Sequence, residues 1–126
     1  MSSDAVTVLV VEDDALFREM TVKLLQRPER TVIDAPDAAT ALALARRQGG
    51  RIDLLVTDLV MDEGDGLLLA RTLSRKHPAL KTLFMSGYGQ EALRAGGLEA
   101  PGRTFIEKPF SPAALDRAVA LLLSGE

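Results

Sequence analysis

The chain has 126 residues, of which 47% are hydrophobic and 26% are charged, and its formal net charge at pH 7 is -3. This length predicts one domain with a single core, and the charge gives no reason to expect binding to nucleic acid or to a membrane. The absence of cysteine excludes disulfides, thiolate catalysis and thiolate metal sites, and it agrees with a cytoplasmic protein.

Short apolar runs alternate with stretches of helical periodicity along the whole chain. The first run, at 6–11, is too short to be a signal peptide or a membrane span and leads directly into acids. Pro28, Gly49-Gly50 and His77-Pro78 each end a helical stretch. The elements expected are strands at 6–11, 31–33, 52–57, 81–85 and 104–106, and helices at 15–26, from 38 to the glycine pair, at 89–95 and at 112–123. A further helix is expected through Leu67, Ala70 and Leu73, beginning near Asp65-Gly66 and ended by His77-Pro78.

Five strands alternating with five helices predict an α/β fold, in which an open parallel sheet carries helices on both faces. Of the two common strand orders, 2-1-3-4-5 places the switch point between the first and third strands. Ligands of such sheets bind outside the carboxyl ends of the strands at this point.

Carboxylates stand at the ends of these two strands. Asp58 closes the central strand, and Glu12, Asp13 and Asp14 follow the first. Asp58 could simply cap the next helix, but that helix is expected to begin nearer Asp65. We therefore expect the acids to converge at the switch point.

Converging carboxylates need a compensating charge. Two carboxylates about 5 Å apart repel by roughly 3 kcal/mol at an effective dielectric constant of about 20. The cluster should therefore show a raised pKa or bind a cation. Mg²⁺ suits a site with few carboxylates that also receives a phosphate.

A hydroxyl and an ammonium group are expected at the same edge of the sheet. Ser86 ends the fourth strand, and Lys108 follows the fifth, directly before Pro109. Ser86 alone would be interpreted as a turn residue, and Lys108 alone as a solvated surface lysine. At successive strand ends beside three acids, they indicate a common site.

The segments Glu12-Asp13, Asp58, Ser86 and Lys108-Pro109-Phe110, in this order and spacing, resemble the receiver domain of two-component response regulators. The resemblance covers the chain and implies a flavodoxin-like receiver fold, with 1–126 as a single receiver domain and no output domain. The runs 84–88 and 108–111 most resemble receivers of hybrid sensor kinases and related stand-alone receivers.

The resemblance implies a role for each site residue. Asp58 would be the phosphoacceptor, Ser86 would bond a phosphoryl oxygen, and Lys108 would pair with the phosphate. Mg²⁺ would be held by Asp58, Asp13 and the backbone carbonyl of Val60, and Glu12 would act largely through water. Phosphoryl transfer requires such an in-line nucleophile, metal and fixed positive charge.

Four positions concern the readout and the lifetime of the phosphorylated state. Asp62 stands where many receivers have proline, and Phe105 stands where many have a switch tyrosine, so Ser86 and Phe105 are the expected switch pair. Val60 and Tyr88 lie two residues beyond the acceptor and beyond the hydroxyl switch, where side chains can hold or exclude the hydrolytic water.

The implied partners are proteins. No Gly-x-x-x-x-Gly-Lys-Ser/Thr motif is present, so the phosphoryl group should come from another protein rather than from ATP directly. The resemblance implies that this donor is a sensor histidine kinase or a histidine phosphotransfer protein of a bacterial-type pathway. The chain would be no enzyme beyond assisting its own phosphorylation and dephosphorylation. It would signal through onward phosphorelay or through a downstream protein on the face of the fourth helix, fifth strand and fifth helix.

Other interpretations remain open. The chain could be an interaction adaptor that is not phosphorylated, or a receiver excised from a hybrid kinase. A phosphatase of the haloacid dehalogenase type would have Asp-x-Asp, where this chain has Val60. The run 87–92 matches a dinucleotide fingerprint but follows the wrong strand. His77, the only histidine, is expected to be solvated.

Overall fold

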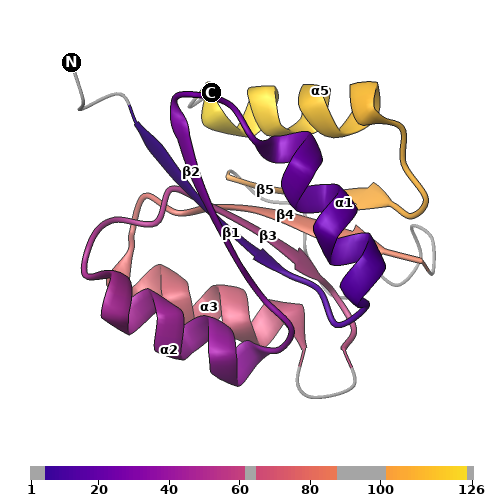
Figure 1. Ribbon diagram of the computed structural model, residues 1–126. Helices are drawn as coiled ribbons and strands as arrows, with labels where there is room; N and C mark the ends of the chain where they lie inside the picture. The colour runs from indigo at the N-terminus through magenta and orange to yellow at the C-terminus, as the bar shows by residue number, and fades with distance from the viewer. Residues whose placement is uncertain (1–4, 62–64, 88–101, 125–126) are drawn as a thin grey trace.

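A five-stranded parallel sheet forms the centre of the computed structural model, which describes residues 5–61, 65–87 and 102–124. The strand order is β2-β1-β3-β4-β5, and every neighbouring pair is parallel (Figure 1). This confirms the predicted order. The strands are β1 (Val6–Val11), β2 (Arg30–Ala35), β3 (Leu54–Asp58), β4 (Lys81–Ser86) and β5 (Arg103–Glu107).

Helices cover both faces of the sheet, as predicted. They are α1 (Ala15–Leu25), α2 (Ala38–Gln48), α3 (Gly66–Lys76) and α5 (Pro112–Leu123). The helices α1 and α5 lie on one face, and α2 and α3 lie on the other (Figure 1). The helix expected at 89–95 lies outside the described residues. In the described parts of the chain, no helix is long and apolar enough to cross a membrane.

Each described helix begins at a side-chain cap. Asp14, Asp37, Asp65 and Ser111 each accept a hydrogen bond from the backbone N–H three residues later. Such caps satisfy one of the unpaired N–H groups of the first turn. Since Asp65 caps α3, Asp58 is not needed as a helix cap, and Asp14 is explained by its position before α1.

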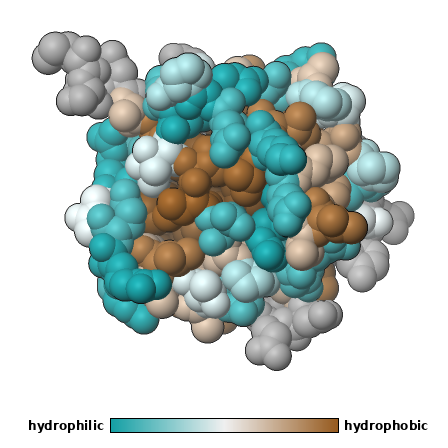
Figure 2. Space-filling model, viewed as in Figure 1, coloured by the Kyte–Doolittle hydropathy of each residue, from teal (hydrophilic) through white to brown (hydrophobic). Residues whose placement is uncertain are grey.

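Two apolar layers hold the sheet between its helices. Successive residues of a strand point to opposite faces, so Val8 and Val10 pack on the α1–α5 side, whereas Leu9 and Val11 pack on the α2–α3 side. All four are fully buried. Strands covered on both faces are continuously apolar, which explains the runs found in the sequence. Hydrophobic residues gather in the middle of the view in Figure 2, above α2.

Several predicted bounds differ from those of the structure: β2 and β5 are longer than the predicted 31–33 and 104–106, β4 ends at Ser86 rather than at 85, and α1 ends at Leu25 rather than at 26. Two further corrections concern the start of β3 and His77. The strand β3 starts at Leu54 rather than at residue 52, because the backbone N–H of Ile52 donates to Nδ1 of His77 at 3.3 Å instead of joining a strand ladder. For the same reason His77 is half-buried and hydrogen-bonded rather than solvated.

Candidate functional site

The carboxyl ends of four strands deliver the candidate site residues to one edge of the sheet. Asp58 is the last residue of β3 and Ser86 the last of β4, while Glu12 follows β1 directly. The ladder continues past the strand ends, since Leu59 N–H donates to Met85 at 2.9 Å and Lys108 N–H donates to Ser86 at 2.7 Å. These backbone bonds fix the mutual positions of Asp58, Ser86 and Lys108.

Gly66, the first residue of α3, packs tightly against Asp58. The N–H of Gly66 donates to the carbonyl of Leu59 at 2.9 Å, and a Cβ at Gly66 would overlap the backbone carbonyl of Asp58. Only glycine fits this close approach. The sequence indicated a turn here, but not that its glycine packs against the site.

A cavity of about 350 Å³ opens at this edge. Its lining consists of Asp13, Asp58, Val60, Met85, Ser86, Gly87 and Lys108. The structure thus brings together most of the residues singled out from the sequence. Glu12 lies beside the cavity and is only 1% exposed, and Phe105 lies farther along β5. Tyr88 and Asp62 lie outside the described residues.

Lys108 joins two of the acids. Its Nζ lies 2.8 Å from Oδ1 of Asp58 and 2.9 Å from Oε1 of Glu12. Burial lowers the pKa of Lys108, but the hydrogen bonds to Asp58 and then Glu12 outweigh it, so the pKa is raised and the group stays cationic. The Nζ also lies 4.5 Å from the ring centroid of Phe17, a cation–π contact, and that ring meets Phe110 edge-on at 5.4 Å.

The pKa of the Glu12 carboxyl group is raised in the folded protein. Burial and then a hydrogen bond with Asp58 raise the pKa of Glu12 to about 7, although the N–H of Asp14 and the ammonium of Lys108 act in the opposite direction. Its Oε2 accepts from Asp14 N–H at 3.0 Å, and its Oε1 accepts from Lys108. Near neutral pH this carboxyl group therefore carries a proton part of the time.

The acidic cluster fits a magnesium site of the receiver type. Glu12, Asp13 and Asp58 each offer one carboxylate oxygen, and these oxygens lie within 4.8 Å of one another. Hard oxygen donors are the ligands that Mg²⁺ prefers. Asp13 is exposed and faces the cavity, whereas both oxygens of Glu12 already accept hydrogen bonds.

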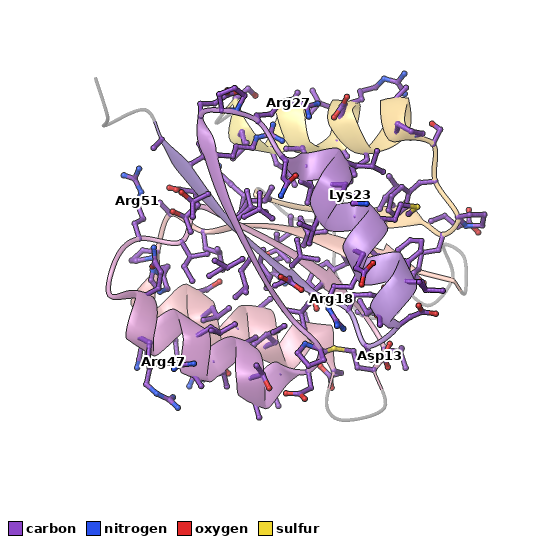
Figure 3. The ribbon with its side chains drawn as sticks, viewed as in Figure 1. Asp13, Arg18, Lys23, Arg27, Arg47 and Arg51 are labelled. Atoms are coloured by element: carbon purple, nitrogen blue, oxygen red, sulfur yellow. The ribbon has the colours of Figure 1, made fainter. Side chains whose placement is uncertain are left out.

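Arg18 supports the loop that carries Asp13, and sequence reasoning did not identify it. Its Nη1 donates to the carbonyl of Glu12 at 2.8 Å, and its Nε pairs with Asp34 of β2 at 3.0 Å. Figure 3 shows Arg18 and Asp13 at the same end of α1. The available signal was spacing, because Arg18 lies one helical turn after the capping Asp14 and faces back toward the strand end.

Phe105 and Ser86 lie on the same face of the sheet. Phe105 stands opposite Phe84 in the β4–β5 register, and Ser86 follows Phe84 by two residues. Phe105 is half-buried against the apolar layer on the α2–α3 side, while Ser86 is 3% exposed. These two side chains are therefore diagonal neighbours.

The fold and the site together define a doubly wound α/β protein with an acidic, magnesium-type cluster and a lysine at its switch point. The family model of the response regulator receiver domain matches residues 8–120. The chain belongs to this family of two-component signalling domains.

Relatives include both hybrid kinases and short receivers. The chain is 39% identical over 122 residues to the sensor kinase CckA of Brucella abortus, covering 96% of this chain but 13% of that protein. It is 34% identical over 103 residues to the response regulator receiver protein CpdR of the same organism, covering 82% of this chain and 84% of CpdR.

A solved structure agrees with these relatives. The receiver domain of the hybrid histidine kinase CckA superimposes with a TM-score of 0.76 at 30% identity, covering 93% of this chain and 98% of that one. Several transcriptional regulatory proteins also match, and the chain spans half of their length or less.

Proposed function

We propose that the chain accepts a phosphoryl group on Asp58 from a phosphohistidine of a sensor kinase or a histidine phosphotransfer protein, in a Mg²⁺-dependent reaction. One observation carries the proposal: the carboxylate of Asp58 shares a cavity with Asp13, Ser86 and Lys108, and its Oδ1 is already paired with the lysine. This is the set of groups that phosphoryl transfer requires.

In the proposed step, a carboxylate oxygen of Asp58 attacks phosphorus in line with the bond from phosphorus to the donor's imidazole nitrogen. That bond breaks, its electron pair returns to the imidazole, and an acyl phosphate forms on Asp58. Lys108 then pairs with a phosphoryl oxygen, and the hydroxyl of Ser86 donates to another.

The metal site is proposed on the same cavity. Asp13, Asp58 and the backbone carbonyl of Val60 would hold Mg²⁺, which when bound neutralises charge that develops on the phosphoryl oxygens. Glu12 would act through water, because Lys108 and the N–H of Asp14 already use its two oxygens.

The signal would leave through the β5 and α5 side of the domain. Phosphorylation adds about -1.5 to -2 charges beside Ser86, whose hydroxyl is drawn toward them. Phe105, the diagonal neighbour of Ser86, then moves inward and changes the surface offered to a downstream protein. Alternatively, the phosphoryl group passes on to a phosphotransfer protein. Both routes place the protein in the cytoplasm with its partners.

Intact mass after incubation with a small phosphodonor and Mg²⁺ tests the proposal. The parent should gain one phosphate, and Asp58→Asn should gain none. Asp65→Asn is the matched control, because asparagine also caps helices and Asp65 does not line the cavity. If the parent gains no phosphate from small donors or from a phosphorylated histidine phosphotransfer protein, the chain acts instead as an adaptor that is not phosphorylated.

A further inference from the structure

A second hollow lies at the amino side of the sheet, opposite the acidic cavity. A cavity of about 450 Å³ opens between the C-terminal ends of α2 and α3, and one of about 400 Å³ continues from it around the α2–β3 turn. The two cavities share Gly49, Gly50, Lys76 and His77 and therefore adjoin, and together they are called the α2–α3 groove. Figure 3 shows Arg47 and Arg51 at this end of the molecule and Asp13 at the other.

The groove combines an apolar floor with a cationic rim. Leu42, Ala45 and Leu73 line the larger cavity, and the exposed side chains of Arg46 and Lys76 stand beside them. Figure 2 shows hydrophilic residues along the left edge of the molecule, where α2 ends. The larger cavity exceeds the one at Asp58 and falls within the range of about 300–1,000 Å³ typical of ligand sites.

The positive charge on the rim is uncompensated. No carboxylate of the described residues lines either cavity, and the ion pairs formed within those residues leave out Arg46 and Lys76. Arg51 is different, because it pairs with Asp53 at 2.6 Å. The helix dipole favours cations near helix C-termini, which accounts for the presence of Arg46 and Lys76 but not for the apolar cavity between them.

His77 adds a fixed hydrogen-bond donor. Its Nδ1 accepts from Ile52 N–H at 3.3 Å, so the neutral ring carries its proton on Nε2. His77 lines both cavities and is half-buried. Its ring is thus held in one orientation at the junction of the groove.

Gly49 and Gly50 lie where the two cavities adjoin. Gly49 has a φ of 71°, and glycine is favoured there because the residue ends α2 in the left-handed region. Gly50 has no such requirement, and a Cβ there would meet only the side chain of Gln48, at 3.4 Å. The Gly50 N–H donates to Oε1 of Gln48 at 3.1 Å, so the Gln48 side chain lies against this part of the turn.

We propose that the α2–α3 groove binds an extended acidic peptide segment of a partner protein. An apolar side chain of the segment fills the larger cavity, and its carboxylates lie against Arg46, Lys76 and Nε2 of His77. Charge complementarity selects an acidic partner, and two adjoining cavities suit an extended chain better than a compact ligand. The surface lies at the edge opposite Asp58, and its lining shares no residue with the acidic cavity.

A random peptide library, screened for peptides that bind the whole chain, tests the proposal. The enriched peptides should combine aspartate or glutamate with an apolar residue. A synthetic copy, followed by fluorescence anisotropy, should bind more weakly as salt is raised. Bound to the labelled protein, it should shift amide resonances within 42–52 and 72–79. Lys76→Glu should weaken binding by about tenfold or more, since it places like charges together.

Arg117→Glu is the matched control, because it reverses an exposed charge on α5, and it should leave peptide affinity unchanged. Gly50→Ala is a second variant, which keeps the fold and narrows the junction, and it should also weaken binding. The proposal is overturned by peptides without acidic residues, by shifts confined to other elements, by equal affinity in Lys76→Glu, or by a failure to enrich any peptide. Self-association through this edge, detected by sedimentation, would assign the groove to a second copy and also overturn it.

Discussion

Lys108 and Asp58, 50 positions apart in sequence, form an ion pair of 2.8 Å in which the carboxylate is 4% exposed. The same ammonium group also holds Glu12, so one cation compensates two buried acids. Removal of one partner of a buried pair leaves an uncompensated charge, which is more destabilising than loss of an exposed pair.

Lys108→Met should therefore destabilise the protein by roughly 2–4 kcal/mol at pH 8, because Asp58 loses its counter-ion and Glu12 must either stay charged beside it or take up a proton. The loss should shrink at pH 5, where the acids can share protons. Urea denaturation at both pH values measures this difference. Lys81→Met serves as a control, since Lys81 forms no ion pair among the described residues. Equal losses at the two pH values would contradict the account.

Glu12 makes the stability depend on pH in an unusual direction. Its pKa is raised from 4.5 to about 7, so between these values the folded protein binds a proton that the unfolded chain has released. Its contribution to the free energy of unfolding therefore falls as pH rises through this window, by roughly 3 kcal/mol in total without a divalent cation. Denaturation curves of the parent and of Glu12→Gln, measured from pH 4.5 to 8, should converge at low pH and favour the variant at high pH. Parallel curves would show that the acidity of Glu12 is ordinary.

Magnesium should stabilise the parent through Asp13. A ligand present at 100 times its dissociation constant adds about 2.7 kcal/mol to the free energy of unfolding. Asp13→Ala should lose this gain but keep the fold, and without metal it should be as stable as the parent or more stable, because one acid of the cluster is gone. Thermal melts with and without Mg²⁺ measure both effects. A variant that gains as much from Mg²⁺ as the parent would remove Asp13 from the ligand set.

Sequence patterns predicted the fold well where local signals agree with tertiary packing. The bounds of β1 and α5 were predicted to the residue, because an apolar run ending in acids and a Ser-Pro helix start are strong local signals. The start of β3 was wrong, because it depends on a hydrogen bond from Ile52 to a side chain 25 residues away. A hydrogen bond between residues so far apart in the chain produces no periodic pattern in the sequence.

The same limit applies to the candidate site. Strand ends and topology indicated which residues meet, because parallel strands bring their carboxyl ends to one edge. They did not indicate that the two carboxylate oxygens of Glu12 accept hydrogen bonds from Lys108 and from the N–H of Asp14. Nor did they indicate that Arg18 donates to the backbone carbonyl of Glu12. Such details depend on the directions of individual atoms, which spacing does not determine.

Phosphorylation should change the domain beyond the cavity. Because Ser86 and Phe105 are diagonal neighbours on one face, movement of the Ser86 side chain should change the position of the Phe105 ring. Amide hydrogen exchange of the phosphorylated protein should therefore change across 86–120 as well as near Asp58. Ser86→Ala should confine the change to the surroundings of Asp58, while Ser74→Ala, a replacement on the exposed surface of α3, should not. A change confined to the site in the parent would count against the coupling.

The lifetime of the acyl phosphate on Asp58 should depend on the side chains at the mouth of the cavity. Hydrolysis needs a water in line with the leaving carboxylate, and polar side chains two residues beyond the acceptor can hold it. Val60 lines the cavity, is 57% exposed and offers no hydrogen bond, so the phosphorylated protein should turn over slowly without a partner phosphatase. Val60→Asn combined with Tyr88→Glu, the latter outside the described residues, should speed phosphate loss about tenfold, or about 1.4 kcal/mol of barrier. Intact mass measured over time gives the rate of phosphate loss. Leu68→Asn is the control, because it places a new exposed amide on α3. Equal or slower loss in the double variant would show that the side chains at 60 and 88 do not govern access of water.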